Sequence, residues 1–100
     1  MRVKFKLYAS LKRGKGTIEV EFEGKTLKDA LRELFKIYPD LSEIVEEEKV
    51  KTFYKIFVNG RDVEHLKGLD TELKEGDEIA IFPPIAGGKI ENPSIFLNKH

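Results

Sequence analysis

Alternation of apolar and charged residues marks two strands at the start of the chain. In residues 2–8, Val3, Phe5 and Leu7 alternate with lysines, which is the two-residue period of a strand with one buried face. Residues 18–22 repeat the pattern with glutamates in place of the lysines. A glycine-containing turn separates the two segments, so they predict a hairpin in which outward lysines face outward glutamates.

A helical period follows the hairpin. Apolar residues in 27–35 recur at spacings of three and four, the pattern of a helix with one buried stripe. Thr26 stands where an N-cap belongs, and Asp29 follows at the position of a capping-box partner. Pro39 disfavours a helical backbone at the residue before it, so we expect the helix to end there.

A second, shorter helix is expected in residues 40–49. Leu41, Ile44 and Val45 share a helical spacing, and the run Glu46-Glu47-Glu48 closes the segment. Three adjacent carboxylates suggest a cation site, but neighbouring residues of a helix point in different directions and hard cations need converging oxygens. We interpret the run as a solvated acidic surface.

The second half of the chain predicts another hairpin and a final strand. Residues 53–58 are aromatic and β-branched, and Asn59-Gly60 is preferred in type I′ turns because both residues tolerate positive φ. A short strand is expected in residues 61–64. Residues 78–82 alternate again, and Pro83 ends that strand because proline has no backbone donor for a ladder.

The element order of strand, strand, helix, strand, short strand and strand predicts an α+β fold. A mixed sheet of four to five strands would carry the helix on one face, in two layers around one core. The first and last strands are expected to form the central pair. The predicted core consists of Val3, Phe5, Leu7, Ile18, Val20, Leu31, Leu34, Ile56, Val58, Leu73, Ile79 and Ile81.

Composition narrows the functional classes. The 100 residues suffice for one domain with one core. The 18 basic and 18 acidic residues cancel, so net charge gives no attraction to nucleic acid or to a membrane. Without cysteine, the chain has no disulfide, thiolate metal site or thiol nucleophile. We recognise no signal peptide or membrane span, which favours a cytoplasmic location, and the 36% charged content is typical of thermophilic proteins.

The polar residues outside the tail do not group into a catalytic or metal site. His65 has no second histidine at ligand spacing and His100 is terminal, so no metal site is expected. The basic turn at residues 12–15 could contact phosphate or an acidic protein surface, although such turns are usually only solvated. We find no combination of nucleophile, base and orienting acid, and therefore do not expect an enzyme that acts alone.

The most informative motif is the run directly after the last predicted strand, Phe82-Pro83-Pro84-Ile85-Ala86-Gly87-Gly88. Glycine has no Cβ, so a double glycine after a rigid domain suits a tail whose own carboxyl group enters a narrow channel. The prolines would stiffen the exit from the strand in an extended form. Phe82, Pro83 and Ile85 form an apolar approach to the tail, for which strand-end packing and partner contact are both open.

Residues 75–88, together with the element order, resemble the MoaD/ThiS sulfur carriers, which have the ubiquitin-like β-grasp fold. The Phe-Pro-Pro run is most similar to the branch of the molybdopterin synthase small subunit. This resemblance implies that the carboxylate of Gly88, beside Gly87, is adenylated by a ubiquitin-activating-like enzyme that uses ATP and is then converted to a thiocarboxylate. A second implied partner is the large subunit of molybdopterin synthase. The chain itself is expected to bind no cofactor. The residues implied in partner binding are Phe82, Pro83, Pro84, Ile85 and Ala86.

Residues 89–100 depart from the family pattern, because these carriers usually end at the second glycine. We therefore divide the chain into a β-grasp domain (1–86), a double-glycine tail (87–88) and a C-terminal extension. Three interpretations of the extension are open. A processing protease removes it and exposes Gly88, its apolar residues 95–97 dock back on the domain, or it serves an unrelated contact.

Two other classes of function are compatible with the sequence. A carrier for thiamine or tRNA thiolation, or a ubiquitin-like modifier joined to lysines through Gly88, would share the activation step. A non-conjugating β-grasp binding module with a structural tail would not be adenylated at all.

Overall fold

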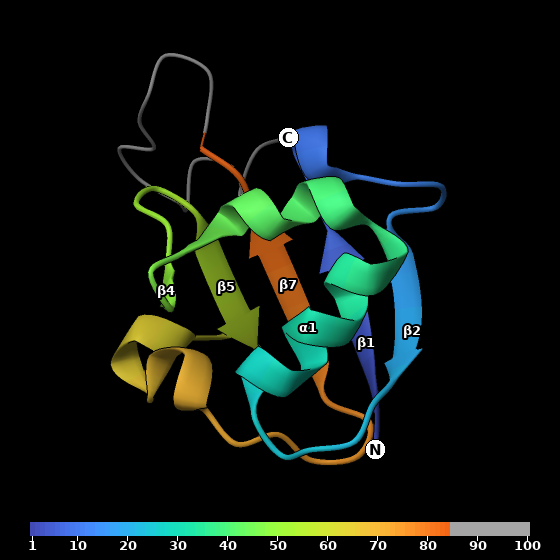
Figure 1. The fold of residues 1–100 in the computed structure, drawn as a ribbon, viewed down its shortest axis with the longest axis vertical. Coiled ribbons are helices and arrows are strands. Elements are labelled where there is room, and N and C mark those ends of the chain that lie inside the picture. The colour runs from blue at the N-terminus through green and yellow to red at the C-terminus, as the bar shows by residue number, and fades with distance from the viewer. Residues whose placement is uncertain (85–100) are drawn as a thin grey trace.

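A computed structural model describes residues 1–84 of the chain. Its main sheet has the spatial order β2-β1-β7-β5-β6, and the helix α1 (Leu27–Ile37) covers one face of it (Figure 1). The strands are β1 (Arg2–Leu7), β2 (Thr17–Glu21), β5 (Lys55–Val58), β6 (Arg61–Asp62) and β7 (Glu78–Phe82). This arrangement confirms the predicted α+β fold, a mixed sheet with a helix on one face.

Strands β1 and β7 form the central pair, as predicted. They run parallel, with Phe5 opposite Ile79 and Leu7 opposite Ile81, whereas β2 is antiparallel to β1 and β5 is antiparallel to β7. Because side chains alternate between the two faces of a strand, this register places the apolar residues of neighbouring strands on the same face. That face is the one covered by α1.

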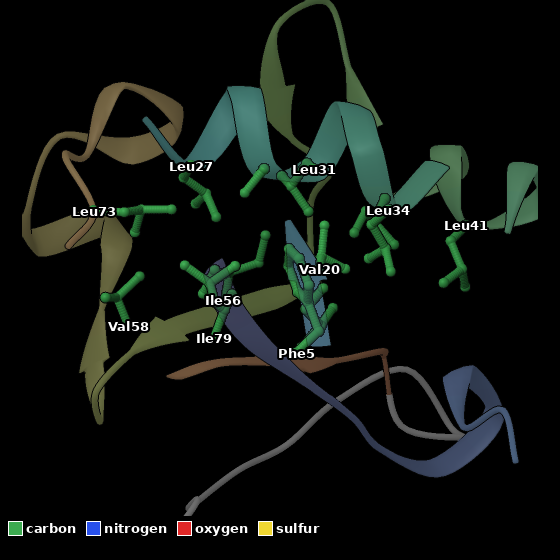
Figure 2. Packing of buried hydrophobic residues seen from close by; sticks show 14 of the residues in the cluster. Phe5, Val20, Leu27, Leu31, Leu34, Leu41, Ile56, Val58, Leu73 and Ile79 are labelled. Carbon is green, nitrogen blue, oxygen red and sulfur yellow. The ribbon is translucent and has the colours of Figure 1, made fainter. Parts of the chain in front are cut away.

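The core lies between the helix and the sheet. Figure 2 shows Leu31 and Leu34 of α1 pointing toward Phe5 and Val20 of the strands. Every residue of the predicted core is buried except Ile18, which is partly covered and packs against the cluster. The prediction did not include eight further buried apolar residues: Leu11, Phe22, Leu27, Ala30, Leu41, Ile44, Val63 and Leu69.

The predicted charge match across the first hairpin is only partly right. Lys4 lies opposite Glu19, as expected. Lys6, however, has its ion pair with Glu78 of β7, at 3.3 Å, rather than with a glutamate of β2. The prediction expected β1 beside β7 but did not include this ion pair between them. Exposed pairs of this kind contribute about 1 kcal/mol or less, so they support the strand order without determining it.

The helix α1 begins at the predicted cap. The Thr26 hydroxyl oxygen accepts a hydrogen bond from the backbone N–H of Asp29 (3.3 Å), and the Asp29 carboxylate accepts one from the backbone N–H of Thr26 (3.2 Å). This is a complete capping box. The helix ends at Ile37, and Pro39 opens the 3₁₀ helix η2 (Pro39–Ile44), so the predicted stop is confirmed.

The prediction of a second helix through residue 49 is wrong beyond Ile44. The chain forms a small hairpin of β3 (Val45–Glu46) and β4 (Lys49–Val50). Glu47 and Glu48 have φ values of 52° and 62°, the positive φ at both central positions that a type I′ turn requires. The facing valines favour an extended backbone because they are β-branched. The acidic run is solvent-exposed, as predicted, but it lies in a turn.

Short elements complete the described chain. The 3₁₀ helices are η1 (Ala9–Leu11), η3 (Val63–His65) and η4 (Gly68–Asp70). Asn59 and Gly60 join β5 to β6 with φ values of 51° and 83°, which agrees with the predicted type I′ turn. Strand β6 is shorter than predicted because η3 begins at Val63. In residues 1–84, no helix has the length and apolar character needed to cross a membrane.

Candidate functional site at the base of the double-glycine tail

Strand β7 brings the chain to one end of the sheet, where its neighbours on both sides hold it by backbone contacts. The backbone N–H of Tyr8 donates to the carbonyl of Ile81 (3.2 Å), and Phe82 lies opposite Lys55 of β5. Pro83 and Pro84 follow, and they have no N–H with which to continue the ladder. The base of the tail is therefore flanked by the end of β1 and the start of β5 (Figure 1).

The two prolines have different surroundings. Pro83 is buried, so it packs into the domain, whereas Pro84 is exposed to solvent. Of these two predicted partner-binding residues, only Pro84 is accessible in the free domain. The remaining predicted site residues, Ile85, Ala86, Gly87 and Gly88, lie outside the described residues, as does the extension 89–100.

Phe82 lies at the centre of an aromatic cluster on the sheet face opposite α1. Ile81 points into the core, so the next side chain of β7 points the other way. The rings of Tyr8 and Phe82 are stacked, and the ring of Phe57 meets Phe82 edge-on with centroids 5.7 Å apart. Such pairs are worth about 0.5–1.5 kcal/mol each beyond simple burial. We define Tyr8, Phe57 and Phe82 as the aromatic cluster. It forms a rigid, partly exposed apolar surface beside the tail.

Sequence reasoning included Phe82 but missed Tyr8 and Phe57. A signal was present, because Phe57 stands between the inward Ile56 and Val58 and must therefore point outward. An aromatic residue at an outward position indicates either a second packing layer or a contact surface. What the prediction did not include was that β5 is the second neighbour of the last strand.

The basic turn between β1 and β2 has a structural role through one of its residues. The Arg13 guanidinium forms an ion pair with Asp40 of η2, and its centre lies 6.0 Å from the ring centroid of Tyr38. It also donates to the carbonyl of Ser10 (3.2 Å). Arg13 therefore fastens the turn to the segment after α1. Because its guanidinium group is already paired in this way, Arg13 does not support the interpretation of the turn as a phosphate contact.

His65 belongs to a small group of possible metal ligands. Ligating atoms of Asp62, Glu64 and His65 lie within 4.8 Å of one another. The Lys55 ammonium group is 3.5 Å from Asp62 and 3.3 Å from Glu64. Burial opposes the charge on Lys55, but its hydrogen bond to Glu64 and the charge of Asp62 outweigh that effect and raise its pKa. Lys55 thus already forms ion pairs with both carboxylates, and we interpret the group as an ion-pair network.

The rest of the body is internally satisfied. Every buried side-chain nitrogen or oxygen found in residues 1–84 has a hydrogen-bond partner. A hollow of about 350 Å³ lies beside the β3-β4 hairpin and is lined by charges of both signs, including the Lys28–Glu48 ion pair at 3.0 Å. The hydrogen bond that the Lys28 ammonium group donates to the Glu48 carboxylate lowers the pKa of Glu48.

A two-layer body that presents a short, thin tail defines the class of β-grasp carrier proteins. The model of the ThiS family matches residues 5–88 of this chain, and the chain belongs to the ThiS/MoaD family of sulfur carriers. The match ends at Gly88, so residues 89–100 lie beyond it.

Three relatives show the range of this similarity. A "Putative sulfur carrier protein" of Archaeoglobus fulgidus is 38% identical over 90 residues, which cover 88% of this chain and 100% of the relative. Small archaeal modifier protein 3 of Haloferax volcanii is 42% identical over 64 residues, covering 63% of this chain and 70% of the relative. The molybdopterin synthase sulfur carrier subunit of Chlamydomonas reinhardtii is 30% identical over 92 residues, which cover 88% of this chain and 100% of the relative.

Solved structures show that the fold is the ubiquitin-like β-grasp. The crystal structure of SAMP1 from Haloferax volcanii superimposes with a TM-score of 0.74 at 30% identity, covering 88% of this chain and 100% of the other. A chain of the Amycolatopsis orientalis BexX/CysO complex gives a TM-score of 0.72 at 31% identity, covering 86% of this chain and 99% of the other.

Proposed function

We propose that this chain is a sulfur carrier whose reactive group is the α-carboxyl group of Gly88. The observation that carries the proposal is a pair of boundaries: β7, the central strand, ends at Phe82, and the family match ends at Gly88. The six residues between them span at most about 20 Å when extended. That length is enough to carry the carboxyl group away from the domain and into the active site of another protein.

The proposed chemistry begins with activation, because a carboxylate is a poor electrophile. A Gly88 carboxylate oxygen attacks the α-phosphorus of ATP on the adenylating enzyme, and pyrophosphate leaves. A hydrosulfide sulfur supplied by the partner system then attacks the acyl carbon. AMP leaves with the anhydride oxygen, the proton passes to solvent, and a thiocarboxylate remains. The partner supplies catalysis by positioning and charge stabilisation, and we place the reaction in the cytoplasm, where ATP is available.

The chain contributes shape rather than catalysis in this scheme. Buried Pro83 fixes the direction in which the tail leaves, and Gly87 and Gly88 have no Cβ to obstruct a narrow channel. The aromatic cluster offers the partner an apolar surface beside that exit, and aromatic residues are enriched at protein interfaces. A chain similar to this one is found in complex with BexX, which supports a partner-dependent role.

A free carboxyl group at Gly88 requires cleavage of the Gly88–Lys89 peptide bond, so we propose that a protease removes residues 89–100. The test is the intact mass of the protein isolated from its native cells. We expect a chain ending at Gly88, with a fraction carrying sulfur in place of one oxygen. A chain that stays full-length in those cells, and that the adenylating enzyme does not activate even when it is truncated at Gly88, would refute the carrier function.

We further propose that the acceptor pathway is molybdopterin synthesis, with this chain as the small subunit of the synthase. The similarity to the Chlamydomonas subunit over 88% of the chain supports this assignment. In a reconstitution, the thiocarboxylated chain and a molybdopterin synthase large subunit should form the dithiolene. Each carrier gives up its single sulfur, so two thiocarboxylates should be consumed for every dithiolene formed. A thiocarboxylate that persists in the presence of the large subunit and its pterin substrate would exclude this pathway.

A second candidate is protein modification, which the similarity to small archaeal modifier protein 3 favours. In that case the activated Gly88 carbonyl would form an amide with a lysine amine of a target protein, and AMP would leave. Digestion of native-cell proteins should then yield lysines that carry a remnant ending in Gly87-Gly88. Absence of such conjugates, together with sulfur on Gly88, would assign the chain to sulfur transfer alone.

A further inference from the structure

Phe53 has an exposed ring at a position where the fold gives it little to pack against. It is 64% exposed, more than any other large apolar side chain in residues 1–84. It lies in a four-residue turn that the backbone N–H of Tyr54 closes by donating to the carbonyl of Lys51 (3.1 Å). Burial in the free domain therefore does not explain the presence of a phenylalanine here.

The backbone of Phe53 is also strained. Its φ is +75°, and it stands at the third position of its turn, which glycine normally occupies in a type II turn. Positive φ is a true outlier for a bulky residue and costs free energy. Because glycine would fit this turn better, the stability of the domain does not account for a phenylalanine at this position.

The location of Phe53 suggests that reason. Its turn leads directly into β5, whose first residue Lys55 lies opposite Phe82, so Phe53 precedes β5 at the end of the sheet where β7 ends and Pro84 follows. Tyr8 follows β1 on the other side of β7 and is 39% exposed. Exposed aromatic side chains therefore flank the base of the tail on both sides.

We propose that Phe53 is a docking residue for the adenylating enzyme, an inference that depends on the proposed carrier function. Any protein that takes up the tail must close around its base, and activation is the step shared by every carrier pathway considered above. The adenylating enzyme is therefore the partner that must contact this end of the sheet. In the complex the ring becomes buried, and that interaction offsets the strain of the turn. Phe53 thus adds a contact on the side of the tail opposite Tyr8.

The test compares Phe53→Gly, Phe53→Ala and Phe53→Tyr in a chain that ends at Gly88. The buried residues of the described part lie between Val3 and Pro83, so this truncation retains the core. Melting temperature reports the strain, and ATP–pyrophosphate exchange gives KM and kcat for the carrier. Ile37→Ala is the matched control, because Ile37 is an exposed apolar residue (48%) at the end of α1.

Stability and docking should move in different directions. Phe53→Gly should have a Tm at or above that of the wild type and about 4 °C above that of Phe53→Ala, because only glycine relieves the positive φ. Both variants should raise the carrier's KM roughly tenfold, as the loss of an aromatic anchor does, with kcat little changed. Phe53→Tyr and Ile37→Ala should keep the wild-type KM.

Each other result overturns the inference. A wild-type KM for Phe53→Gly shows that the enzyme does not use the ring. If that variant instead changes the Tm of the full-length chain alone, or its oligomeric state, the ring contacts residues 89–100 or a second copy. A large loss of Tm in Phe53→Gly assigns the ring to the fold. If the wild-type chain is not activated, the proposed carrier function fails and the inference fails with it. If the wild-type chain is activated at a normal rate and the Phe53 variants keep the wild-type KM, only the inference fails.

Discussion

The ring of Tyr8 lies parallel to the ring of Phe82, with centroids 4.4 Å apart and planes within 2° of each other. Tyr8 directly follows β1, and Phe82 is the last residue of β7, so the stack joins the two central strands at the point where the tail begins. A rigid base of this kind gives the six tail residues a defined origin. It also leaves an apolar surface beside that origin.

Replacement of Tyr8 by alanine separates the structural role of this stack from its proposed role in docking. The variant keeps the backbone N–H that donates to Ile81, so β1 and β7 stay paired. We expect a loss of about 1 kcal/mol in the free energy of unfolding, measured in urea, and a severalfold rise in the KM for activation. Tyr8→Phe keeps the stack and should retain both values. A loss of stability with an unchanged KM would mean that the cluster only packs the strand end.

The capping box at the start of α1 makes stability depend on pH. Hydrogen bonds from the backbone N–H groups of Lys25 and Thr26, and from the Thr26 hydroxyl, lower the pKa of Asp29 below its ordinary value. A lowered carboxyl pKa stabilises the folded state above the unfolded value of about 3.9, and this contribution is lost as the pH falls through the folded value. Asp29→Ala should therefore be less stable than the wild type at pH 7, with the difference shrinking below pH of about 4. Urea unfolding of both proteins from pH 7 to below pH of about 4 measures this difference in the free energy of unfolding. A difference that stays constant down to acid pH would contradict the prediction.

Gly24 is required by the same capping box. A Cβ built at Gly24 would lie 2.5 Å from a carboxylate oxygen of Asp29, and the φ of Gly24 is 137°. Gly60 has a positive φ of 83° but open space around it, so Gly60→Ala measures the backbone effect alone, about 1 kcal/mol. Gly24→Ala should cost more, because it also displaces the carboxylate. Equal unfolding free energies for the two variants would show that the carboxylate moves aside without cost.

Most of the fold follows from local patterns, and the exceptions have a common cause. Alternation located β1, β2 and β7, and Thr26 with Asp29 located the start of α1, because these signals depend on residues close in sequence. The hairpin at residues 45–50 was missed because Val45 fits a helical spacing with Leu41 and Ile44, and because a pair of glutamates is not a typical turn sequence. The aromatic cluster was missed because it joins three strands that are far apart in the sequence.

That missed turn gives a stabilising change. Glu47 and Glu48 adopt positive φ, which costs more for glutamate than for the Asn-Gly pair found at the equivalent turn after β5. Glu47→Asn combined with Glu48→Gly should raise the Tm by about 4 °C, measured by circular dichroism. The Lys28–Glu48 ion pair is lost in this variant, but exposed pairs contribute little. A Tm below the wild type would show that the ion pair outweighs the turn strain.

Gly87 tests whether the tail must be thin. The residue lies beyond β7 and beyond Pro83, the last buried residue in the described part of the chain. In a chain ending at Gly88, Gly87→Val should leave the Tm unchanged and abolish ATP–pyrophosphate exchange, because the branched side chain cannot enter a channel shaped for glycine. Gly87→Ala adds one methyl group and should retain a reduced rate. If the valine variant is activated at the wild-type rate, channel width does not explain the double glycine, and its role would be backbone freedom, which Gly87→Pro could then examine.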